Sequence, residues 1–361
     1  MTLEEKKKKI AKIKNDVVKK YGDGMFISAN EVEPVTFYPT GVPSLDTILG
    51  GGIAKGRIFS VYGEYSAGKT SFALQTVAHN QKLDDACYCL YVDQEASFDP
   101  LYAEALGVDL ERLNVIPADE AEKNLDLLRS LINEGVYNII ILDSTNALVP
   151  STELSKDVSA TSSIGTIAKL LSVFTRMIVG PLNKNKTSLI CIEQTRDKVG
   201  AMVLPGMPTP VVVGAGKAVS YYCSQRLELK RGKPITEGED TIGIYTKAKC
   251  VKNKVGKPFA KVDVPMVSGK GFDVEMDNQI FIINSGVVTR LNNVKWAYTT
   301  NNGDVIEIKG QKNIISTLKE NNLYEQALEN AKKKVFSNLD SSSEYEGLDL
   351  EEEQNKIIET D

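Results

Sequence analysis

The feature that most constrains the fold is a glycine-rich loop, GEYSAGKTS, at residues 63–71. It follows RIFSVYG at 57–63, a run typical of a buried strand, and it opens a segment with helical periodicity at 69–80. Loops in this position cradle phosphates, because their backbone N–H groups point inward at phosphate oxygens and the start of the helix adds a favourable dipole. The sequence therefore predicts a nucleotide-binding site at the end of this strand.

The side chains of this cradle have distinct expected roles. The Lys69 ammonium is expected to reach the β- and γ-phosphates, and the Thr70 hydroxyl to bind Mg²⁺. ATP and Mg²⁺ are therefore the expected cofactors. The residues expected to line the rest of the cradle are Gly63, Glu64, Tyr65, Ser66, Ala67, Gly68 and Ser71.

Apolar runs and helical patterns alternate through the middle of the chain. Strands are expected at 87–93, 138–143 and 187–194, and helices at 99–107, 119–134 and 163–180. This alternation predicts an α/β fold with a mostly parallel sheet covered by helices on both faces. The β-rich runs at 226–230, 242–254 and 259–267 predict hairpins that extend the sheet, and the last part of the chain predicts a small mixed domain with helices at 311–320 and 323–335.

Acidic and amide side chains follow three of these strands, at the sheet edge where the cradle ends. Asp143, after four apolar residues, suits a Walker B aspartate that orients Mg²⁺ through water. Asp93 and Glu95 follow another strand, and Glu95 is the better candidate to orient and deprotonate an attacking water. Gln194 ends the strand expected at 187–194, where a neutral amide could contact a γ-phosphate. The catalytic set expected from this edge is Lys69, Glu95 and Gln194.

Two segments outside the sheet need a partner or a function. Residues 3–20 predict a helix with a narrow apolar stripe, which must pack on something, and 25–28 (MFIS) predict a short strand. The segment after Gln194, TRDKVGAMVLPGMPTPVVVGAGK, is long for a strand-to-helix connection. Loops of this length are usually functional or disordered.

Composition excludes several other classes of protein. The only histidine, His79, makes a histidine-based metal site or catalytic triad improbable, and the five cysteines lie in apolar runs, which predicts buried free thiols. No run approaches the ~18 apolar residues of a membrane span, and we expect a cytoplasmic protein with no membrane partner. The net charge of −5 hides a segregation: residues 1–20 hold eight lysines and three acids, and 341–361 hold eight acids and one lysine. Such termini are solvated tails or electrostatic regulators of a basic surface.

In this order, the motifs resemble those of the RecA family of bacterial recombinases and of RecA-like proteins encoded by phages. The stretches that carry the resemblance are TGVPSLDTILGGGIAKGRIFSVYGEYSAGKTS, YVDQEASFDPLYAEALGVDLERL, IIILDSTNALVP, EQTRDKVGAM and KCVKNKVGKPF, within roughly residues 5–275. The resemblance implies a P-loop NTPase core of RecA type. It divides the chain into an N-terminal oligomerisation helix and strand at 1–35, a core at 36–274, a small α+β domain at 275–338 and an acidic tail at 339–361.

The resemblance also implies roles for residues around the nucleotide. Tyr102 would stack on adenine with Asp99 near its amino group, and Ser144 would support the metal beside Asp143. Gln194 would sense the γ-phosphate and order the loop that follows it. Lys252 and Lys254 would reach the nucleotide of the neighbouring subunit, unless they are a solvated strand edge.

DNA and a second copy of the chain are the implied partners. Two loops, about 155–165 and 195–213, and the helix between them would bind DNA through Ile164, Gly165, Lys169, Ser172, Arg176, Arg196, Lys198, Gly200, Met202 and Val203. The subunit interface of a helical filament would use Ile10, Ile13, Val17, Phe26 and Tyr221.

Four features depart from the family pattern, and one is Ser268, which stands where a tyrosine would help hold the adenine. Glu193 replaces a neutral polar residue and places a negative charge beside Gln194. Val203 stands where an aromatic residue would be familiar, and the second loop is longer, with Pro205, Pro208 and Pro210.

The expected function is that of an ATP-dependent DNA recombinase. It would form filaments on single-stranded DNA and exchange strands with duplex DNA in recombination and repair, with single-stranded DNA-binding and loader proteins as further partners. Two alternatives stay open at this stage: a hexameric DNA helicase on the same core, and a scaffold that binds ATP and DNA without useful turnover.

Overall fold

A computed structural model of the chain describes residues 1–22, 26–154, 165–197, 211–213 and 217–340. Two compact units make up the chain, Met1–Thr36 and Phe37–Asp361. We describe each by itself.

The N-terminal unit consists of the helix α1 (Leu3–Tyr21) and a short 3₁₀ turn, η1 (Ala29–Glu31). Thr2 and Glu5 form a capping box that satisfies backbone N–H groups at the start of α1. None of the side chains of α1 is buried within this unit. The predicted helix is thus confirmed.

The strand predicted at 25–28 is wrong for its described residues, Phe26 to Ser28, which form no strand. A strand needs a neighbour to satisfy its backbone groups, and no strand pairs with this segment in the described part of the chain. Phe26 and Ile27 are both largely exposed.

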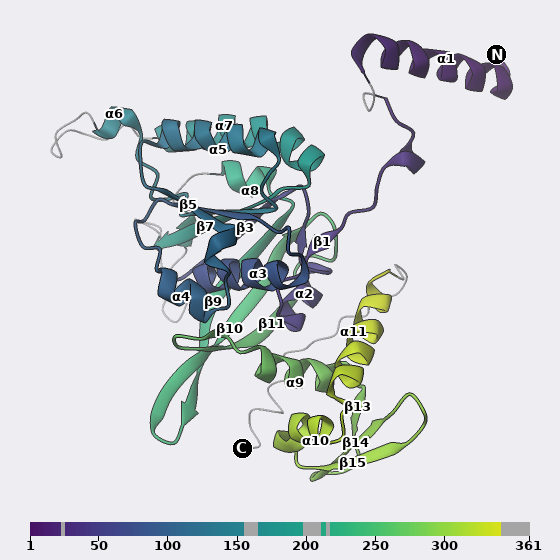
Figure 1. Ribbon diagram of the computed structural model, residues 1–361, viewed down its shortest axis with the longest axis vertical. Helices are drawn as coiled ribbons and strands as arrows, with labels where there is room; N and C mark the ends of the chain where they lie inside the picture. The colour runs from purple at the N-terminus through teal and green to yellow at the C-terminus, as the bar shows by residue number, and fades with distance from the viewer. Residues whose placement is uncertain (23–25, 155–164, 198–210, 214–216, 341–361) are drawn as a thin grey trace, which may run out of the picture. The chain divides into compact units, whose positions relative to one another are not determined.

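One large sheet dominates the second unit (Figure 1). Its described strands follow the order β12, β11, β10, β9, β3, β7, β6, β4, β5, and β8 pairs with β7. The parallel strands are β3 (Ile58–Gly63), β4 (Cys89–Asp93), β5 (Leu113–Pro117), β6 (Ile139–Asp143), β7 (Ser188–Asp197) and β9 (Gln225–Glu237). The antiparallel additions are β8 (Val211–Val213), β10 (Asp240–Asn253), β11 (Lys261–Val267) and β12 (Gly271–Phe272). The expectation of a mostly parallel sheet extended by hairpins is confirmed.

Helices cover both faces of this sheet, as Figure 1 shows. On one face lie α2 (Pro43–Leu49), α3 (Lys69–Leu83) and α4 (Pro100–Ala105), and on the other α5 (Ala121–Glu134), α7 (Thr166–Asn185) and α8 (Ala218–Tyr222). Alternate residues of each strand enter opposite cores, so Phe59 packs on the α3 side and Ile58 on the α7 side. The shorter elements are β1 (Phe37–Tyr38), β2 (Ile53–Ala54), η2 (Leu110–Arg112) and α6 (Ser151–Leu154).

The helix α7 ends later than the sequence indicates. The expectation placed its end at residue 180, before Pro181, but the helix continues to Asn185. A proline removes one backbone hydrogen bond and usually ends a helix. Here Ile178 and Leu182 are fully buried on either side of it, and this packing offsets the lost hydrogen bond.

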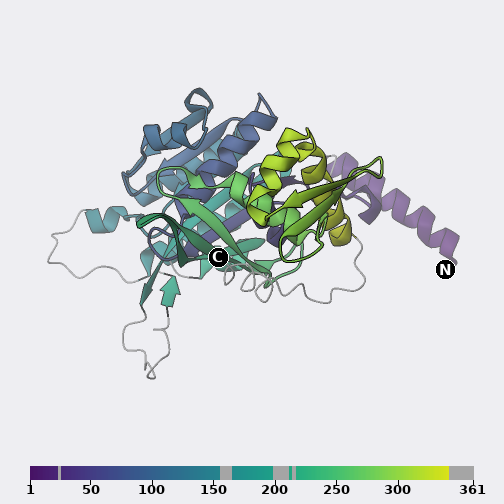
Figure 2. The ribbon, with the colours of Figure 1, turned by 90° about the horizontal axis from the view of Figure 1, so that it is seen from below.

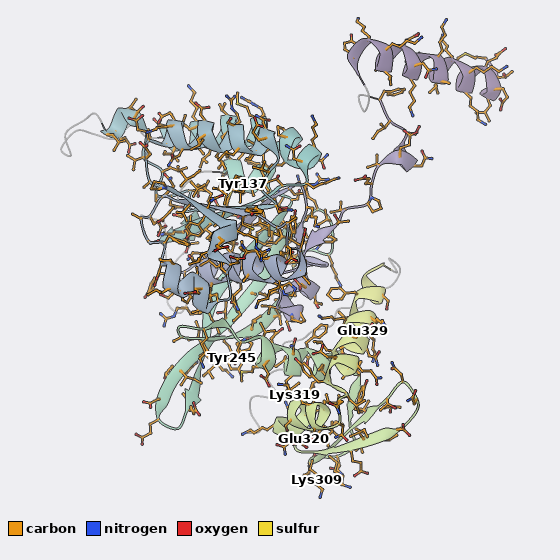
Figure 3. All side chains as sticks on the ribbon, viewed as in Figure 1. Tyr137, Tyr245, Lys309, Lys319, Glu320 and Glu329 are labelled. Atoms are coloured by element: carbon orange, nitrogen blue, oxygen red, sulfur yellow. The ribbon has the colours of Figure 1, made fainter. Side chains whose placement is uncertain are left out.

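The C-terminal domain has its own sheet and its own core (Figure 2). It contains α9 (Val274–Asn284), β13 (Val288–Arg290), β14 (Lys295–Thr299), β15 (Val305–Lys309), η3 (Gln311–Asn313), α10 (Ile314–Glu320) and α11 (Tyr324–Asp340). On its surface Lys319, labelled in Figure 3, lies with its Nζ 2.7 Å from Glu275 Oε1. The backbone N–H of Ser44 in α2 donates to the buried Asp277 of α9 at 3.0 Å, which joins this domain to the large sheet domain.

The five cysteines are free and buried, as expected. No helix among the described residues is both long and apolar enough to cross a membrane.

Candidate functional site

The cradle between β3 and α3 depends on two glycines for its shape. At Gly63 an added Cβ would lie 1.9 Å from the carbonyl oxygen of Leu229 on the neighbouring strand β9. At Gly68 the backbone has a φ of +92°, and an added Cβ would lie 2.6 Å from Met266 Sδ. Neither position can hold a side chain without a shift of its surroundings. Between them, Glu64, Tyr65 and Ser66 are exposed, as a loop that receives a ligand must be.

Lys69, the first residue of α3, folds back over the cradle. Its Nζ donates to the carbonyl oxygens of Gly63 at 3.1 Å and Glu64 at 2.5 Å. Burial lowers the pKa of Lys69, and the nearby carboxylates Asp143 and Glu95 oppose this shift. The ammonium therefore rests on loop carbonyls that a phosphate oxygen, as a charged acceptor, can replace.

A hydrogen-bonded cluster of oxygen atoms lies where β6 ends. The Thr70 hydroxyl donates to Asp143 Oδ2 at 2.8 Å, and the Tyr91 hydroxyl donates to the same oxygen at 2.6 Å. Burial raises the pKa of Asp143, which favours its neutral form. A cation bound nearby would oppose this shift and favour the charged form. Tyr91 was not expected at the site. Only its place on β4, next to β6, could have indicated it.

These oxygen donors fit Mg²⁺. Among the described residues no group of three or more His, Cys, Asp or Glu side chains could hold a metal. A Mg²⁺ ion at Thr70 and Asp143 would thus take its remaining ligands from phosphates and water, which is how proteins usually bind this ion.

Glu95 and Gln194 meet across the end of the sheet. Gln194 Nε2 donates to Glu95 Oε1 at 2.6 Å, and the Ser144 hydroxyl donates to the same oxygen. Asp93, the other acid of this strand, instead accepts from the backbone N–H groups of Ser97 and Phe98, at 3.1 and 3.0 Å. Asp93 therefore shapes the turn, which leaves Glu95, an exposed side chain, for chemistry.

The backbone of Gln194 is held by Asn146, a residue that no motif or spacing in the sequence indicated. Asn146 Oδ1 accepts from the Gln194 backbone N–H at 3.1 Å, and its Nδ2 donates to the Gln194 carbonyl at 3.2 Å. Both backbone groups of Gln194 are thus fixed by one side chain. Its amide side chain is aimed at Glu95 from a rigid base.

The residues expected around adenine lie beside the cradle. Tyr102 on α4 shares a hydrogen bond of 2.7 Å with Ser71 of α3 through their hydroxyl groups. Asp99 caps α4, since its Oδ1 accepts from the Leu101 backbone N–H at 2.9 Å. The structure brings Tyr102 and the cradle together, while Asp99 has a capping role within its own loop.

The lysines expected to act between subunits lie on the opposite side of β9 from β3. Lys252 Nζ donates to the carbonyl oxygens of Ser220 at 2.7 Å and Tyr221 at 3.0 Å, both on α8. Burial lowers the pKa of Lys252. Lys254 is exposed, and so is 67% of Tyr221. These residues therefore form one group at α8, separate from the contacts of Lys69.

Six of the ten residues expected to bind DNA lie outside the described residues or have side chains that do. Gly165 precedes α7, and Lys169, Ser172 and Arg176 follow at helical spacings of three and four, which places them on one face. Lys169 and Arg176 are exposed and Ser172 is half-buried. Ile164, Lys198, Gly200, Met202, Val203 and the Arg196 side chain are the ones that fall outside.

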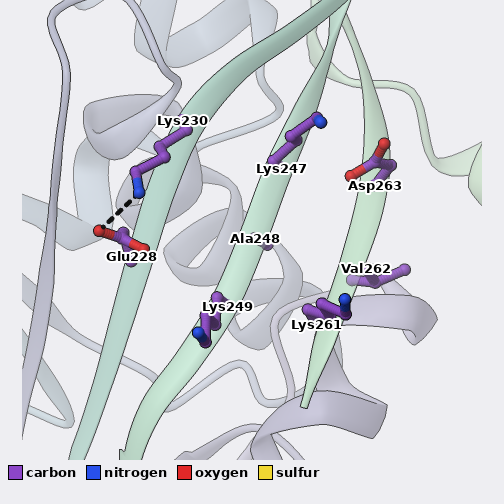
Figure 4. A pocket seen from close by; sticks show the side chains of 8 residues that line it. All are labelled: Glu228, Lys230, Lys247, Ala248, Lys249, Lys261, Val262 and Asp263. Carbon is purple, nitrogen blue, oxygen red and sulfur yellow. Dashed lines mark ion pairs between the residues drawn. The ribbon is translucent and has the colours of Figure 1, made fainter. Parts of the chain in front are cut away.

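A lysine-rich hollow that the sequence did not indicate lies on the extended part of the sheet (Figure 4). It has a volume of about 260 Å³ and is lined by Glu228 and Lys230 of β9, Lys247, Ala248 and Lys249 of β10, and Lys261, Val262 and Asp263 of β11. Lys249 and Lys261 are direct neighbours across the two strands. Glu228, in register with Lys249 and ion-paired with Lys230, places an acid among these lysines. The alternation of lysines in KAK at 247–249 is the trace of this hollow in the sequence, but it does not show which side chains lie opposite them.

Comparison with known proteins places these features in context. The family model described as the RecA N-terminal domain matches residues 8–273. A relative from Thermotoga sp. (strain RQ2), named Protein RecA, is 35% identical over 325 residues, which cover 88% of this chain and 89% of the relative. Relatives of the same name from Staphylococcus epidermidis and Staphylococcus carnosus are 34% and 32% identical, over 88% and 99% of this chain and 88% and 96% of their own.

Proposed function

The chain belongs to the RecA family of recombinases, and from this membership and the site geometry we propose that it hydrolyses ATP with Mg²⁺ to drive strand exchange on DNA. The observation that carries the proposal is the contact of Gln194 Nε2 with Glu95 Oε1 at the end of the cradle. This hydrogen bond joins Glu95, the candidate general base, to Gln194, the residue that precedes the long segment TRDKVGAMVLPGMPTPVVVGAGK. A change at the nucleotide would therefore alter a contact made by the residue from which that segment begins.

Each part of the site has a defined task in this proposal. Backbone N–H groups of the cradle and the Lys69 ammonium would bind the phosphates, and Thr70 and Asp143 would hold a Mg²⁺ ion, which would supply positive charge for the phosphate oxygens. The Glu95 carboxylate takes a proton from the attacking water. The Gln194 amide would then exchange its hydrogen bond to Glu95 for one to the γ-phosphate, which would couple the nucleotide to the start of the segment after β7.

Assembly of subunits into a filament would use surfaces of both units. In one copy Phe26, Ile10 and Ile13 expose apolar side chains. In another copy β5 is the last strand of the sheet, one of its edges pairs with no strand in the described part of the chain, and Val115 is exposed. A contact between two different surfaces gives a closed ring if the rotation per subunit closes and an open helix if it does not, and we propose the open helix. Lys252 and Lys254 would then complete the nucleotide site of the next subunit.

DNA binding would rely on exposed cations that read no sequence. Lys169 and Arg176 on α7, with the lysine-rich hollow, can neutralise phosphates. Contacts to phosphates position a strand but do not select bases. This agrees with a protein whose specificity comes from pairing between the strands themselves.

One experiment with three readouts tests the proposal. Purified protein is mixed with single-stranded DNA, homologous duplex, ATP and Mg²⁺, and we expect joint molecules, DNA-stimulated phosphate release and helical filaments in electron micrographs. Closed rings with directional unwinding would instead identify a helicase. DNA binding without phosphate release would identify a scaffold. A Lys69→Ala variant is the control, and it should lose all three activities.

A further inference from the structure

A buried carboxylate, Glu193, lies directly before Gln194 on β7. Its side chain is fully buried. The Ser60 hydroxyl of β3 donates to Glu193 Oε1, and Arg226 Nη2 of β9 lies 3.6 Å from the same oxygen. A charge is rarely buried unless it has a partner. The burial of the Glu193 carboxylate therefore depends on its contacts with Ser60 and Arg226.

The three side chains come from three adjacent strands. In the sheet, β3 lies between β7 and β9, with Tyr62 opposite Glu193 and Ser60 opposite Arg226. The Arg226 guanidinium lies 4.2 Å from the centroid of the Tyr62 ring. The pair therefore spans the strand that carries the phosphate cradle and ties together the strands on either side of it.

Glu193 and Arg226 each have one further polar atom that the contacts above leave unpaired. Glu193 Oε2 and Arg226 Nε are both buried and without a hydrogen-bond partner among the described residues. Burial raises the pKa of Glu193, whereas the hydrogen bond from Ser60 and the attraction of Arg226 act in the opposite direction. Removal of either partner would leave the other as an uncompensated buried charge.

We propose that Glu193 is a positioning residue, which through Arg226 fixes the end of β7 so that the Gln194 amide meets Glu95. Side chains alternate along a strand, so the Glu193 carboxylate and the Gln194 amide point to opposite faces of β7. A contact that holds the Glu193 side chain in place therefore also fixes the direction in which the Gln194 side chain points. The inference rests on the proposed ATP hydrolysis for its functional consequence, and on the buried pair for its physical basis.

The Glu193–Arg226 pair also lies next to Lys252, one of the lysines expected to act between subunits. Arg226 is paired in register with Lys252 on β10, and Lys252 holds α8 through its hydrogen bonds to Ser220 and Tyr221. Glu193, Arg226 and Lys252 thus lie on β7, β9 and β10, with the cradle strand β3 between the first two.

The test uses the full-length protein and the nearly isosteric variant Glu193→Gln, with Arg226→Gln and the double variant beside it. Hydrogen exchange of the β7 amides, measured without nucleotide, should become about tenfold faster in each single variant. The double variant should be no faster than the faster single one, because both changes remove the same pair. Asp277→Asn removes another buried carboxylate, on α9, and should leave β7 exchange unchanged.

Steady-state hydrolysis with single-stranded DNA supplies the functional readout. Glu193→Gln should lower kcat about tenfold and leave KM for ATP within about twofold, since it displaces the reacting groups and not the nucleotide contacts. Unchanged β7 exchange, or faster exchange with unchanged kcat, would overturn the inference. A wild-type protein without DNA-stimulated hydrolysis would overturn the proposed function instead, and β7 exchange would then decide on Glu193 alone.

Discussion

Substitution of Gly63 by alanine is the sharpest structural test of the nucleotide cradle. The new Cβ would lie 1.9 Å from the Leu229 carbonyl oxygen, whereas side-chain carbons do not approach within 3.0 Å of such an atom. The strands β3 and β9 would therefore have to separate by about 1.1 Å at this point. Because the clash is with backbone, no rotation of a side chain can relieve it.

The free-energy cost follows from this geometry. Insertion of a methyl group into a packed site costs about 1–3 kcal/mol. A φ of +152° adds about 1 kcal/mol for alanine, because the position favours glycine. We expect the free energy of unfolding to fall by about 3 kcal/mol in Gly63→Ala. The affinity for ATP should also fall at least about tenfold, since a factor of ten corresponds to only ~1.4 kcal/mol.

Urea denaturation and binding of a fluorescent ATP analogue measure the two effects. Gly180→Ala is the matched control, because Gly180 lies in α7 with no other atom within 4 Å of an added Cβ. Alanine in an open helical position should stabilise the protein by up to about 1 kcal/mol. If Gly63→Ala unfolds at the same urea concentration as the wild type, the argument from the β3–β9 contact is wrong.

Three further predictions address the chemistry, the charge and the electrostatic surface. Glu95→Gln should lower the kcat of DNA-stimulated phosphate release about 10²–10⁴-fold while nucleotide binding is kept, and unchanged turnover would remove Glu95 from the mechanism. Burial raises the pKa of Asp277 to about 6, so the folded protein keeps a proton that the unfolded chain has released. The free energy of unfolding should therefore fall as the pH rises from about 4 to 6, by at most about 1.4 kcal/mol per pH unit, and urea denaturation of Asp277→Asn should show a smaller slope. Lys249→Gln and Lys261→Gln should each reduce the slope of log K for DNA against log salt by about 0.7–0.9, and Lys319→Gln, in the small domain, should leave it unchanged in the same titration.

The parallel strands at the centre of the sheet could be predicted from the sequence because they are almost wholly apolar. The runs that end at Asp93 and Asp143 lie between helices on both faces, so every position favours burial. The strand β5 was not expected. It lies at the edge of the sheet, and Val115 is 40% exposed, which weakens the apolar signal that marks its neighbours.

The candidate site was predictable to the extent that its residues lie at strand ends. Glu95 follows β4 and Gln194 lies on β7, and the carboxyl ends of these parallel strands meet at one edge of the sheet, which made their proximity predictable. The contributions of Tyr91 and Asn146 depend on which side chain faces which, and sequence spacing carries no such information. The lysine-rich hollow likewise needs the register of β9, β10 and β11, which three separate strand patterns do not contain.

The helix α1 has a consequence for assembly that can be followed by spectroscopy. Its 19 residues are capped at both ends, but none of them is buried. Isolated helices become marginal in water below about 12–15 residues, so α1 is only a little longer than that limit. In a dilute solution of single protomers, heat should melt this helix gradually and at a lower temperature than the rest. The ellipticity per residue at 222 nm should then become more negative as the protein concentration rises, because contact with a neighbouring subunit would stabilise α1.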